Sequence, residues 1–132
     1  MRSRVLGLAL VLTLTACGGP RVVTVPVEAG SAHVAVGEIL HIDLGPANES
    51  IGDGWFLVTA PDAAVLGDGE ETFESECDQP GCGGRAGWSF PARGEGTTSV
   101  VFRYCYRSTS DDCQPEPDRG PAEPVSFTVT VG

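Results

Sequence analysis

The stretch SVVFRYCYR, Ser99–Arg107, decides the fold because large apolar side chains alternate along it with other residues. In an extended strand, successive side chains point to opposite faces. One face then carries Val100, Phe102, Tyr104 and Tyr106, and the other carries Val101, Arg103, Cys105 and Arg107. The stretch VSFTVTV, Val125–Val131, repeats the same period of two, with valine and phenylalanine on one face and serine and threonine on the other. Two such strands predict a sheet with one face buried and the other in water.

Short segments of this kind recur along the chain between residues that favour turns, namely glycine, proline, aspartate and asparagine. No window shows the sustained 3.6-residue period of a helix. The pattern predicts an all-β protein with a single β-sandwich domain. The predicted strands are Val22–Val27, Ser31–Val36, Ile39–Leu44, Trp55–Ala60, Glu71–Ser75, Ala86–Ala92, Thr98–Arg107 and Pro124–Val131.

The first residues have the pattern of an export signal. Arg2 and Arg4 precede an apolar run, Val5–Leu14, which is shorter than the roughly 20 residues that span a bilayer and is typical of a cleaved signal peptide. The run ends in Leu-Thr-Ala-Cys, with the cysteine at Cys17, and this resembles the lipobox of bacterial lipoproteins. The resemblance implies a signal peptide at residues 1–16 and a lipid on the Cys17 thiol. It also implies a place in the bacterial cell envelope, facing the periplasm or the exterior.

Cleavage before Cys17 removes 16 of the 132 residues and leaves 116, enough for one domain. We expect residues 17–25 to be the lipidated cysteine and a tether, and residues 26–132 to be the sandwich. The whole chain has a formal net charge of −10 and contains no lysine. This charge disfavours nucleic acid and anionic lipid headgroups as partners. We therefore expect a monomer that contacts the membrane through its lipid anchor only.

Four cysteines remain after Cys17, and in an oxidising compartment they predict two disulfides. Cys77 and Cys82 flank the turn-forming stretch Asp-Gln-Pro-Gly, and Cys105 and Cys113 flank seven residues at the end of a strand. Three pairings are possible, and the spacing favours these two local pairs. A disulfide between the sheets would need an inward-facing cysteine on an early strand, which the chain lacks. The spacing also differs from the pairs of cysteines that hold structural zinc.

Catalytic patterns are absent from the sequence. His41 shares a strand face with Ile39 and Asp43, and we expect it, like His33, to be a paired imidazole without a catalytic role. No Gly-x-Ser-x-Gly motif is present, and disulfide formation leaves no free thiol. An acidic run lacks the loop pattern of a dedicated calcium site and is predicted to be a solvated edge. Its residues are Glu70, Glu71, Glu74, Glu76 and Asp78. We expect no enzymatic activity, metal or cofactor.

Three segments nevertheless form an ordered series: NESIGDGW at Asn48–Trp55, GCGG at Gly81–Gly84 and RST at Arg107–Thr109. They resemble, in the same order, the Asn-Pro-Thr-Thr-Gly-Tyr-x-Trp, Gly-x-Gly-Gly and Arg-Pro-Trp motifs of the chagasin family of cysteine protease inhibitors. Flanking strands extend the resemblance over about residues 31–131. In the first segment Asn48, Gly52 and Trp55 match, whereas the proline and both threonines do not, and in the third segment only Arg107 matches. Two departures have a clear physical consequence: Glu49 in place of the proline and Thr109 in place of the tryptophan.

The resemblance implies an immunoglobulin-like sandwich whose three loops form a wedge across the active-site cleft of a papain-like cysteine protease. The first loop would block the catalytic Cys–His pair and the other two would hold the rims of the cleft. Inhibition would be reversible and would involve no reaction. The implied protease-binding residues are Asn48, Glu49, Ser50, Ile51, Gly52, Gly81, Cys82, Gly83, Gly84, Arg107, Ser108 and Thr109.

The two departures remove a stiffening proline and an aromatic anchor. Our hypothesis is that the disulfides Cys77–Cys82 and Cys105–Cys113 restore rigidity to the second and third loops, because a constrained loop has less freedom to lose on binding. The alternative function is a binding or scaffold lipoprotein of the cell envelope that has the same fold and does not inhibit proteases.

Overall fold

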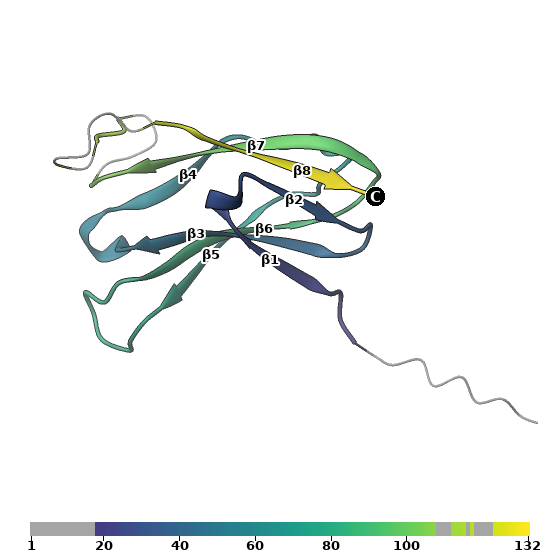
Figure 1. The fold of residues 1–132 in the computed structure, drawn as a ribbon. Helices are drawn as coiled ribbons and strands as arrows, with labels where there is room; N and C mark the ends of the chain where they lie inside the picture. Colours follow the sequence, from purple (N-terminus) through teal and green to yellow (C-terminus); the bar gives the residue numbers. More distant parts are fainter. Residues whose placement is uncertain (1–17, 108–111, 116, 118–122) are drawn as a thin grey trace, which may run out of the picture.

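The computed structural model describes residues 18–107, 112–115, 117 and 123–132. In these residues eight strands form two four-stranded sheets that face each other, and no α-helix is present (Figure 1). The strands are β1 Val22–Pro26, β2 Ser31–Val34, β3 Ile39–Ala47, β4 Gly54–Thr59, β5 Glu70–Ser75, β6 Gly84–Pro91, β7 Gly96–Cys105 and β8 Val125–Val131. Two single-turn 3-10 helices are η1 Val27–Ala29 and η2 Glu49–Ile51. The predicted all-β sandwich is confirmed.

One sheet has the strand order β1-β3-β6-β5 and the other has the order β2-β8-β7-β4. The central pairs are antiparallel, whereas β1 and β2 add to the edges as parallel neighbours of β3 and β8. Helix η1 carries the chain from the edge of the first sheet to the edge of the second. No helix in the described part of the chain is long and apolar enough to cross a bilayer.

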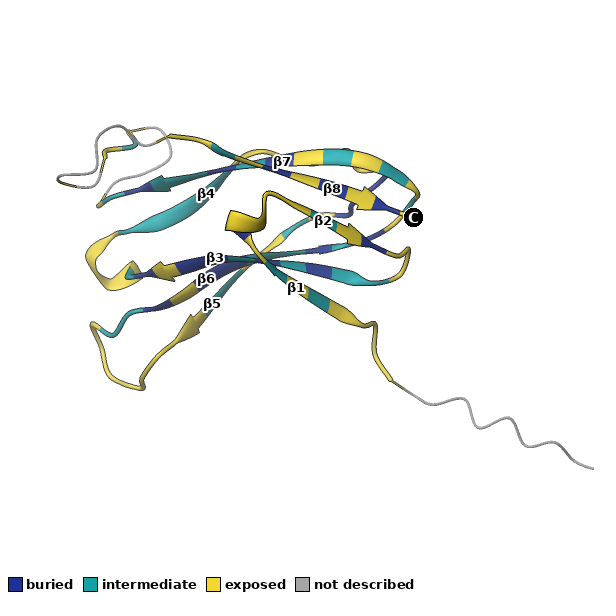
Figure 2. Ribbon diagram, viewed as in Figure 1, coloured by how far each residue is buried: buried dark blue, intermediate teal, exposed yellow. Residues whose placement is uncertain are grey.

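The hydrophobic core is formed by residues of both sheets, and Figure 2 shows buried residues, in dark blue, along strands of each sheet. In β3 the residues Leu40, Ile42 and Leu44 are buried, and the residues that alternate with them are half-exposed. The largest fully buried side chains are those of Phe90, Phe102 and Phe127. Each buried side chain of this size contributes about 1.5–3 kcal/mol. The period of two in the sequence therefore identified the core faces correctly.

A β-bulge near the end of β3 reverses this alternation. The pairing of β3 with β6 shifts between Asp43 and Gly45. Gly45 has a φ of 90° and donates its N–H to Asp43 Oδ1 over 2.9 Å. Beyond the shift Ala47 is buried and Pro46 is exposed. A proline, which has no N–H to donate, is thereby accommodated while the strand stays paired up to Ala47.

All eight predicted strands are present, with ends that differ by up to three residues. The longest difference is in β3, which continues to Ala47 rather than Leu44. The predicted boundary between tether and domain was wrong. Val22–Pro26 pair with β3 as strand β1, so the sandwich begins at Val22 and not at residue 26. Of the described residues, only 18–21 precede the sandwich.

The two predicted disulfides are confirmed. Cys77 bonds to Cys82 and Cys105 bonds to Cys113, with Cα atoms 6.0 and 4.9 Å apart. The first disulfide closes the connection between β5 and β6. The second joins the end of β7 to the segment that leads back towards β8. Both constrain connections and neither joins the two sheets.

The expectation that Cys105 lies on a water-facing side of its strand was wrong. Cys105 is fully buried, although strand alternation puts it on the same face as Arg103. The segment that follows β7 lies against this end of the strand. Cys113 forms the disulfide with Cys105, and Tyr106 donates its N–H to the carbonyl oxygen of Gln114 over 3.1 Å. This cover comes from residues that follow β7 and return over it, so the alternation within the strand alone could not reveal it.

An ion pair bridges β3 and β6 on the outer face of the first sheet. Arg85 Nη2 lies 2.8 Å from Asp43 Oδ2, and Arg85 Nε donates to the same oxygen over 3.3 Å. Burial by itself would raise the pKa of Asp43, but the hydrogen bonds from Arg85 and from the Gly45 N–H outweigh it and lower the pKa below 3.8. The carboxylate is therefore more acidic in the folded chain than in the unfolded chain.

The Asp43–Arg85 pair should stabilise the fold in a pH-dependent way. Because folding lowers the pKa of Asp43, its contribution is complete above about pH 5 and disappears as the pH falls through the folded pKa. Against Asp43→Asn, the wild-type advantage in free energy of unfolding should be about 0.5–1 kcal/mol at pH 7, as for a partly exposed pair, and should be smaller at pH 2. Urea unfolding at both pH values measures this difference. An equal difference at both would contradict the assignment.

The two disulfides should differ in their resistance to reduction. Cys77 is exposed and Cys82 is half-exposed, whereas Cys105 is fully buried and Cys113 is half-exposed, so the second disulfide offers a reductant less access. Limited dithiothreitol followed by alkylation and peptide mapping should label Cys77 and Cys82 well before Cys105 and Cys113, because a reductant must reach the sulfur that it attacks. In 6 M urea the difference should disappear. Equal labelling in the folded protein would refute the protection of Cys105.

Candidate functional site

The three predicted loops lie at one end of the sandwich, opposite the C-terminus (Figure 1). Ala47, the last residue of β3, pairs with Gly84, the first residue of β6. Gly54, the first residue of β4, pairs with Cys105, the last residue of β7. Residues 48–53 connect β3 to β4 and so join these two pairings. We call this end the tip, with a first loop (48–53), a second loop (76–83) and a third loop whose described residues are 106–107 and 112–115.

The first loop is a compact turn. Helix η2, Glu49–Ile51, begins after Asn48, whose Oδ1 accepts a hydrogen bond from Ser50 N over 3.2 Å. Gly52 ends the turn with a φ of 87°, a conformation that favours glycine, and donates its N–H to Glu49 O over 3.1 Å. Local hydrogen bonds thus define the loop although the proline of the family motif is absent. The turn presents the Glu49, Ser50 and Ile51 side chains to solvent.

Ile51 gives the first loop an apolar end. Its side chain is 40% exposed, and it is the only large exposed hydrophobic residue in the described part of the tip. The other large hydrophobic residues that are exposed lie elsewhere in the described chain: Val22, Val36 and Val58. Anchors in protein interfaces are commonly large apolar side chains that enter a pocket on the partner. Ile51 is therefore the candidate anchor of the tip.

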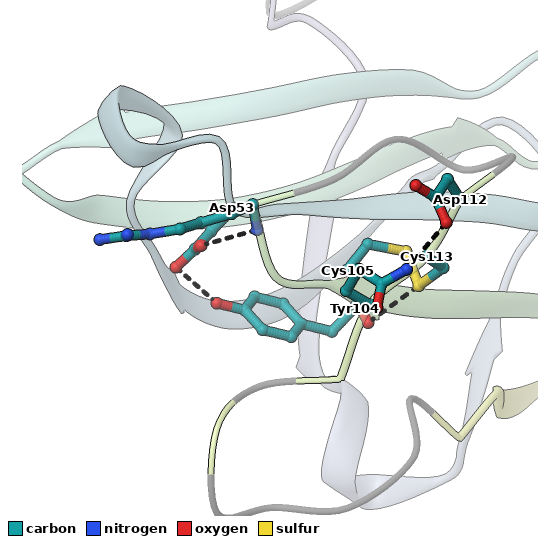
Figure 3. The surroundings of a disulfide bond; sticks show 7 residues. Asp53, Tyr104, Cys105, Asp112 and Cys113 are labelled. Atoms are coloured by element: carbon teal, nitrogen blue, oxygen red, sulfur yellow. Dashed lines mark hydrogen bonds between the residues drawn. A yellow bond between two sulfur atoms is a disulfide. The ribbon is translucent and has the colours of Figure 1, made fainter.

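Asp53 connects the first loop to the third (Figure 3). Tyr104 Oη donates a hydrogen bond to Asp53 Oδ2 over 2.7 Å, and the backbone N–H of Arg107 donates to Asp53 Oδ1 over 3.3 Å. The Tyr104 ring also packs edge-on against Trp55, with ring centroids 5.6 Å apart. A Cβ atom added to Gly52 would lie 3.4 Å from Arg107 Cα. The two loops are thus in direct contact.

The second loop is held mainly by its own chain. The Cys77–Cys82 disulfide spans it, and below the disulfide Glu76 donates its N–H to Gly83 O over 3.0 Å. Gly81 has a φ of 83° with open space around its Cα, so glycine is needed there for its backbone conformation alone. The loop's residues from Glu76 to Gly81 are exposed. The hypothesis of a covalently constrained second loop agrees with this geometry.

The two final glycines of the GCGG segment have different environments. A Cβ on Gly83 would lie 3.5 Å from Ala47 O, an ordinary contact, and Gly83 is half-exposed. Gly84 is buried as the first residue of β6, and a Cβ there would collide with Glu74 O and the Phe73 ring. The expectation that Gly84 lies on the contact surface is therefore corrected: Gly84 allows the close pairing of β5 with β6.

Arg107 is the one predicted contact residue of the third loop that the structure describes, and it lies at the tip. Arg107 is exposed and has a φ of 47°, an uncommon conformation for a residue with a side chain. Its guanidinium carbon lies 5.2 Å from the centre of the Tyr106 ring, in cation–π contact. Ser108 and Thr109 lie outside the described residues. The structure thus brings the first two loops and Arg107 together.

Charge around the tip is mainly acidic. Partial burial and, secondly, the negative charge of Glu49 raise the pKa of Glu71 on strand β5.

The two histidines lie away from the tip, and each has a hydrogen-bonding neighbour. His41 Nδ1 lies 3.0 Å from Ser89 Oγ, and His33 Nε2 lies 2.7 Å from Gly132 O. Among the described residues, no group of three His, Cys, Asp or Glu side chains is placed to hold a metal ion.

Reasoning from the sequence missed the contact between Asp53 and Tyr104 at the tip. Asp53 follows Gly52, at the position where the family motif has tyrosine, and lies outside the contact set that the resemblance implies. Tyr104 belongs to the apolar row of its strand and was expected in the core. The weak available signal was a carboxylate next to a predicted loop, but the two residues are 51 positions apart. Only the pairing of β4 with β7 brings them together.

Comparison with known proteins agrees with this geometry. Amebosin, in its solution structure, is 18% identical, with a TM-score of 0.58 over 86% of this chain and 100% of its own. The cysteine protease inhibitor EhICP2 from Entamoeba histolytica is 14% identical, with a TM-score of 0.57 over 87% of this chain and 99% of its own. PbICP-C, in complex with falcipain-2, is 17% identical, with a TM-score of 0.50 over 87% and 93%. At these identities the likeness establishes a shared fold.

The comparison with curated protein sequences finds no match. A family model does match: it is described as chagasin family peptidase inhibitor I42, and it covers residues 33–131. This range is about three-quarters of the chain, and it includes all three loops and every strand from β3 to β8. The resemblance in the loop motifs and the family match therefore agree, and the chain belongs to the chagasin family of peptidase inhibitors.

Proposed function

We propose that this protein inhibits papain-like cysteine proteases reversibly, with the tip occupying the active-site cleft. The observation that carries the proposal is the gathering of the first two motif-bearing loops and Arg107 of the third motif at one end of the sandwich. Membership of a peptidase inhibitor family supports it. Two proteins of the same fold support it further, since one is described as a cysteine protease inhibitor and another is found in complex with falcipain-2.

Such inhibition needs occupation of the cleft and no chemistry by the inhibitor. The first loop would enter the cleft, because its single-turn helix is compact and presents Ile51 outwards. The second loop, with Gly81–Gly83, and the third loop, with Arg107, would contact the rims. We propose that the protein is not an enzyme, since its family is one of peptidase inhibitors and the described groups at the tip bind one another or face solvent.

Preorganisation explains how a small surface could bind tightly. A nanomolar dissociation constant requires about −12 kcal/mol, and ordering a flexible loop on binding would consume part of the available interaction energy. Here the Cys77–Cys82 disulfide constrains the second loop, and hydrogen bonds define the first. The rigid backbone would compensate for the missing proline at Glu49.

We also propose that the protein is a lipoprotein of the bacterial cell envelope, anchored through Cys17. Val22 begins β1 opposite Ile39, at the end of the sandwich away from the tip. Residues 18–21 can span at most about 14 Å. An anchored domain would therefore stay close to the membrane with its tip directed away, at a distance set by strands such as β7, whose ten residues extend about 33 Å.

Inhibition and its dependence on Ile51 test the proposed function. The chain from Gly18 to Gly132 contains all eight strands and can be titrated against papain with a peptide substrate. We expect competitive inhibition. Ile51→Ala should raise the inhibition constant about tenfold or more, equivalent to about 1.4 kcal/mol, because it removes the apolar anchor.

Val58→Ala is the matched control for Ile51→Ala. Val58 is 51% exposed on strand β4, outside the tip, and its loss should leave the inhibition constant unchanged. An inhibitor that responds equally to both substitutions would use a different surface. Absence of inhibition up to high micromolar concentration would reject the proposed function and favour a binding module without inhibitory activity.

Lipidation predicts a separate result in bacterial cells. The full-length chain should incorporate a labelled fatty acid and sediment with membranes, whereas Cys17→Ser should do neither, because the thiol is the attachment point. Several acyl chains would make attachment effectively permanent, at about 0.8 kcal/mol for each buried methylene. Label in the Cys17→Ser protein would show that the anchor lies elsewhere.

A further inference from the structure

We propose that Asp53 is the positioning residue of the tip, whose carboxylate holds the first and third loops together as one rigid contact surface. This inference rests on the proposed function and adds to it a specific role for a residue outside the implied contact set. Asp53 is half-buried, follows the turn that presents Ile51, and precedes strand β4. It is therefore placed between the cleft-entering loop and the sandwich.

Each oxygen of the carboxylate accepts a hydrogen bond from a different residue where strand β7 passes into the third loop. Asp53 Oδ2 accepts the Tyr104 hydroxyl at 2.7 Å, at the end of strand β7. Asp53 Oδ1 accepts the N–H of Arg107 at 3.3 Å, just beyond that strand. Hydrogen bonds to a charged acceptor are stronger than those between neutral groups. A single side chain thus fixes both the strand end and the turn that leaves it.

The backbone of Arg107 explains why such an interaction is needed. Its φ of 47° is unfavourable for a residue with a Cβ and persists only where the surroundings hold it. A Cβ atom added to Gly52 would lie 3.4 Å from Arg107 Cα, so the backbones of the first and third loops approach each other beside this hydrogen bond. Release of the Arg107 N–H would therefore loosen the third loop from the first.

The second loop differs, and this contrast makes the proposal specific. Its disulfide and its own hydrogen bonds hold it without a contribution from Asp53. In the described residues, a Cβ atom added to Gly83 would lie 3.5 Å from the carbonyl oxygen of Ala47, which ends β3 just before the first loop. Loss of the Asp53 carboxylate should therefore loosen two of the three loops and leave the second unchanged.

Hydrogen exchange in the free protein tests the positioning role without any protease. Asp53→Ala should speed the exchange of the Arg107 amide at least about tenfold, because its acceptor is lost. Exchange of the Glu76 amide in the second loop should not change. Asp68→Ala is the matched control, since Asp68 is an exposed carboxylate in the connection between β4 and β5 at the opposite end. Unchanged exchange at Arg107 in Asp53→Ala would overturn the proposal.

Inhibition of papain tests the consequence. Asp53→Ala should raise the inhibition constant about tenfold or more, mainly through faster dissociation, with strand amides as protected as in the wild type. Tyr104→Phe keeps the ring on Trp55 and removes the hydroxyl that Asp53 accepts. The double variant should be no weaker than Asp53→Ala alone, because both changes break the same interaction. Effects that multiply would contradict a shared interaction.

The nearly isosteric Asp53→Asn keeps the test decisive if Asp53→Ala does not fold: it should also raise the inhibition constant and speed Arg107 exchange, by less. If the wild-type protein inhibits papain and no Asp53 substitution changes the inhibition constant or the Arg107 exchange rate, the positioning role is refuted and the proposed function stands. A wild-type protein that does not inhibit would refute the proposed function, and the exchange experiment would still decide whether Asp53 joins the two loops.

Discussion

The register of two antiparallel strand pairs determines where every described loop residue of the tip lies. Two pairings bring the ends of four strands to the same end of the sandwich: Ala47 lies opposite Gly84 in one sheet, and Gly54 lies opposite Cys105 in the other. A slip by one residue would turn the buried row of a strand towards water. The hydrophobic effect, by fixing the faces of β3 and β7, therefore also fixes the loops.

The tip is held by three kinds of interaction that act over different distances. Hydrogen bonds within one turn define the first loop, and a disulfide across five positions constrains the second. The third loop is constrained by the Cys105–Cys113 disulfide across eight positions and by a contact between distant parts of the chain, the hydrogen bonds of Asp53 with Tyr104 and Arg107. A protein of this size gains from such constraints because its core alone buries a limited part of its surface.

Function in this family member is an outcome of shape and rigidity. The described tip offers one exposed apolar side chain, several glycine turns and acidic residues at its flank. Two adjacent glycines of one motif have different physical roles here. Gly84 is buried and allows strand pairing, whereas Gly83 is half-exposed in the loop. The tether leaves from the opposite end, so anchoring at Cys17 would leave the tip free.

The sequence by itself determined the eight strands, the faces of β3 and β7 that form the core, the two disulfide pairs and the family. These depend on local periodicity, on short separations along the chain and on the order of the loop motifs. Only the tertiary structure decided that Cys105 and Gly84 are buried, that the sandwich begins at Val22, and that Asp53 meets Tyr104 and Arg107. The physical reason is that burial and hydrogen bonding between residues some 50 positions apart arise from the pairing of strands and the return of loops, which no local pattern specifies.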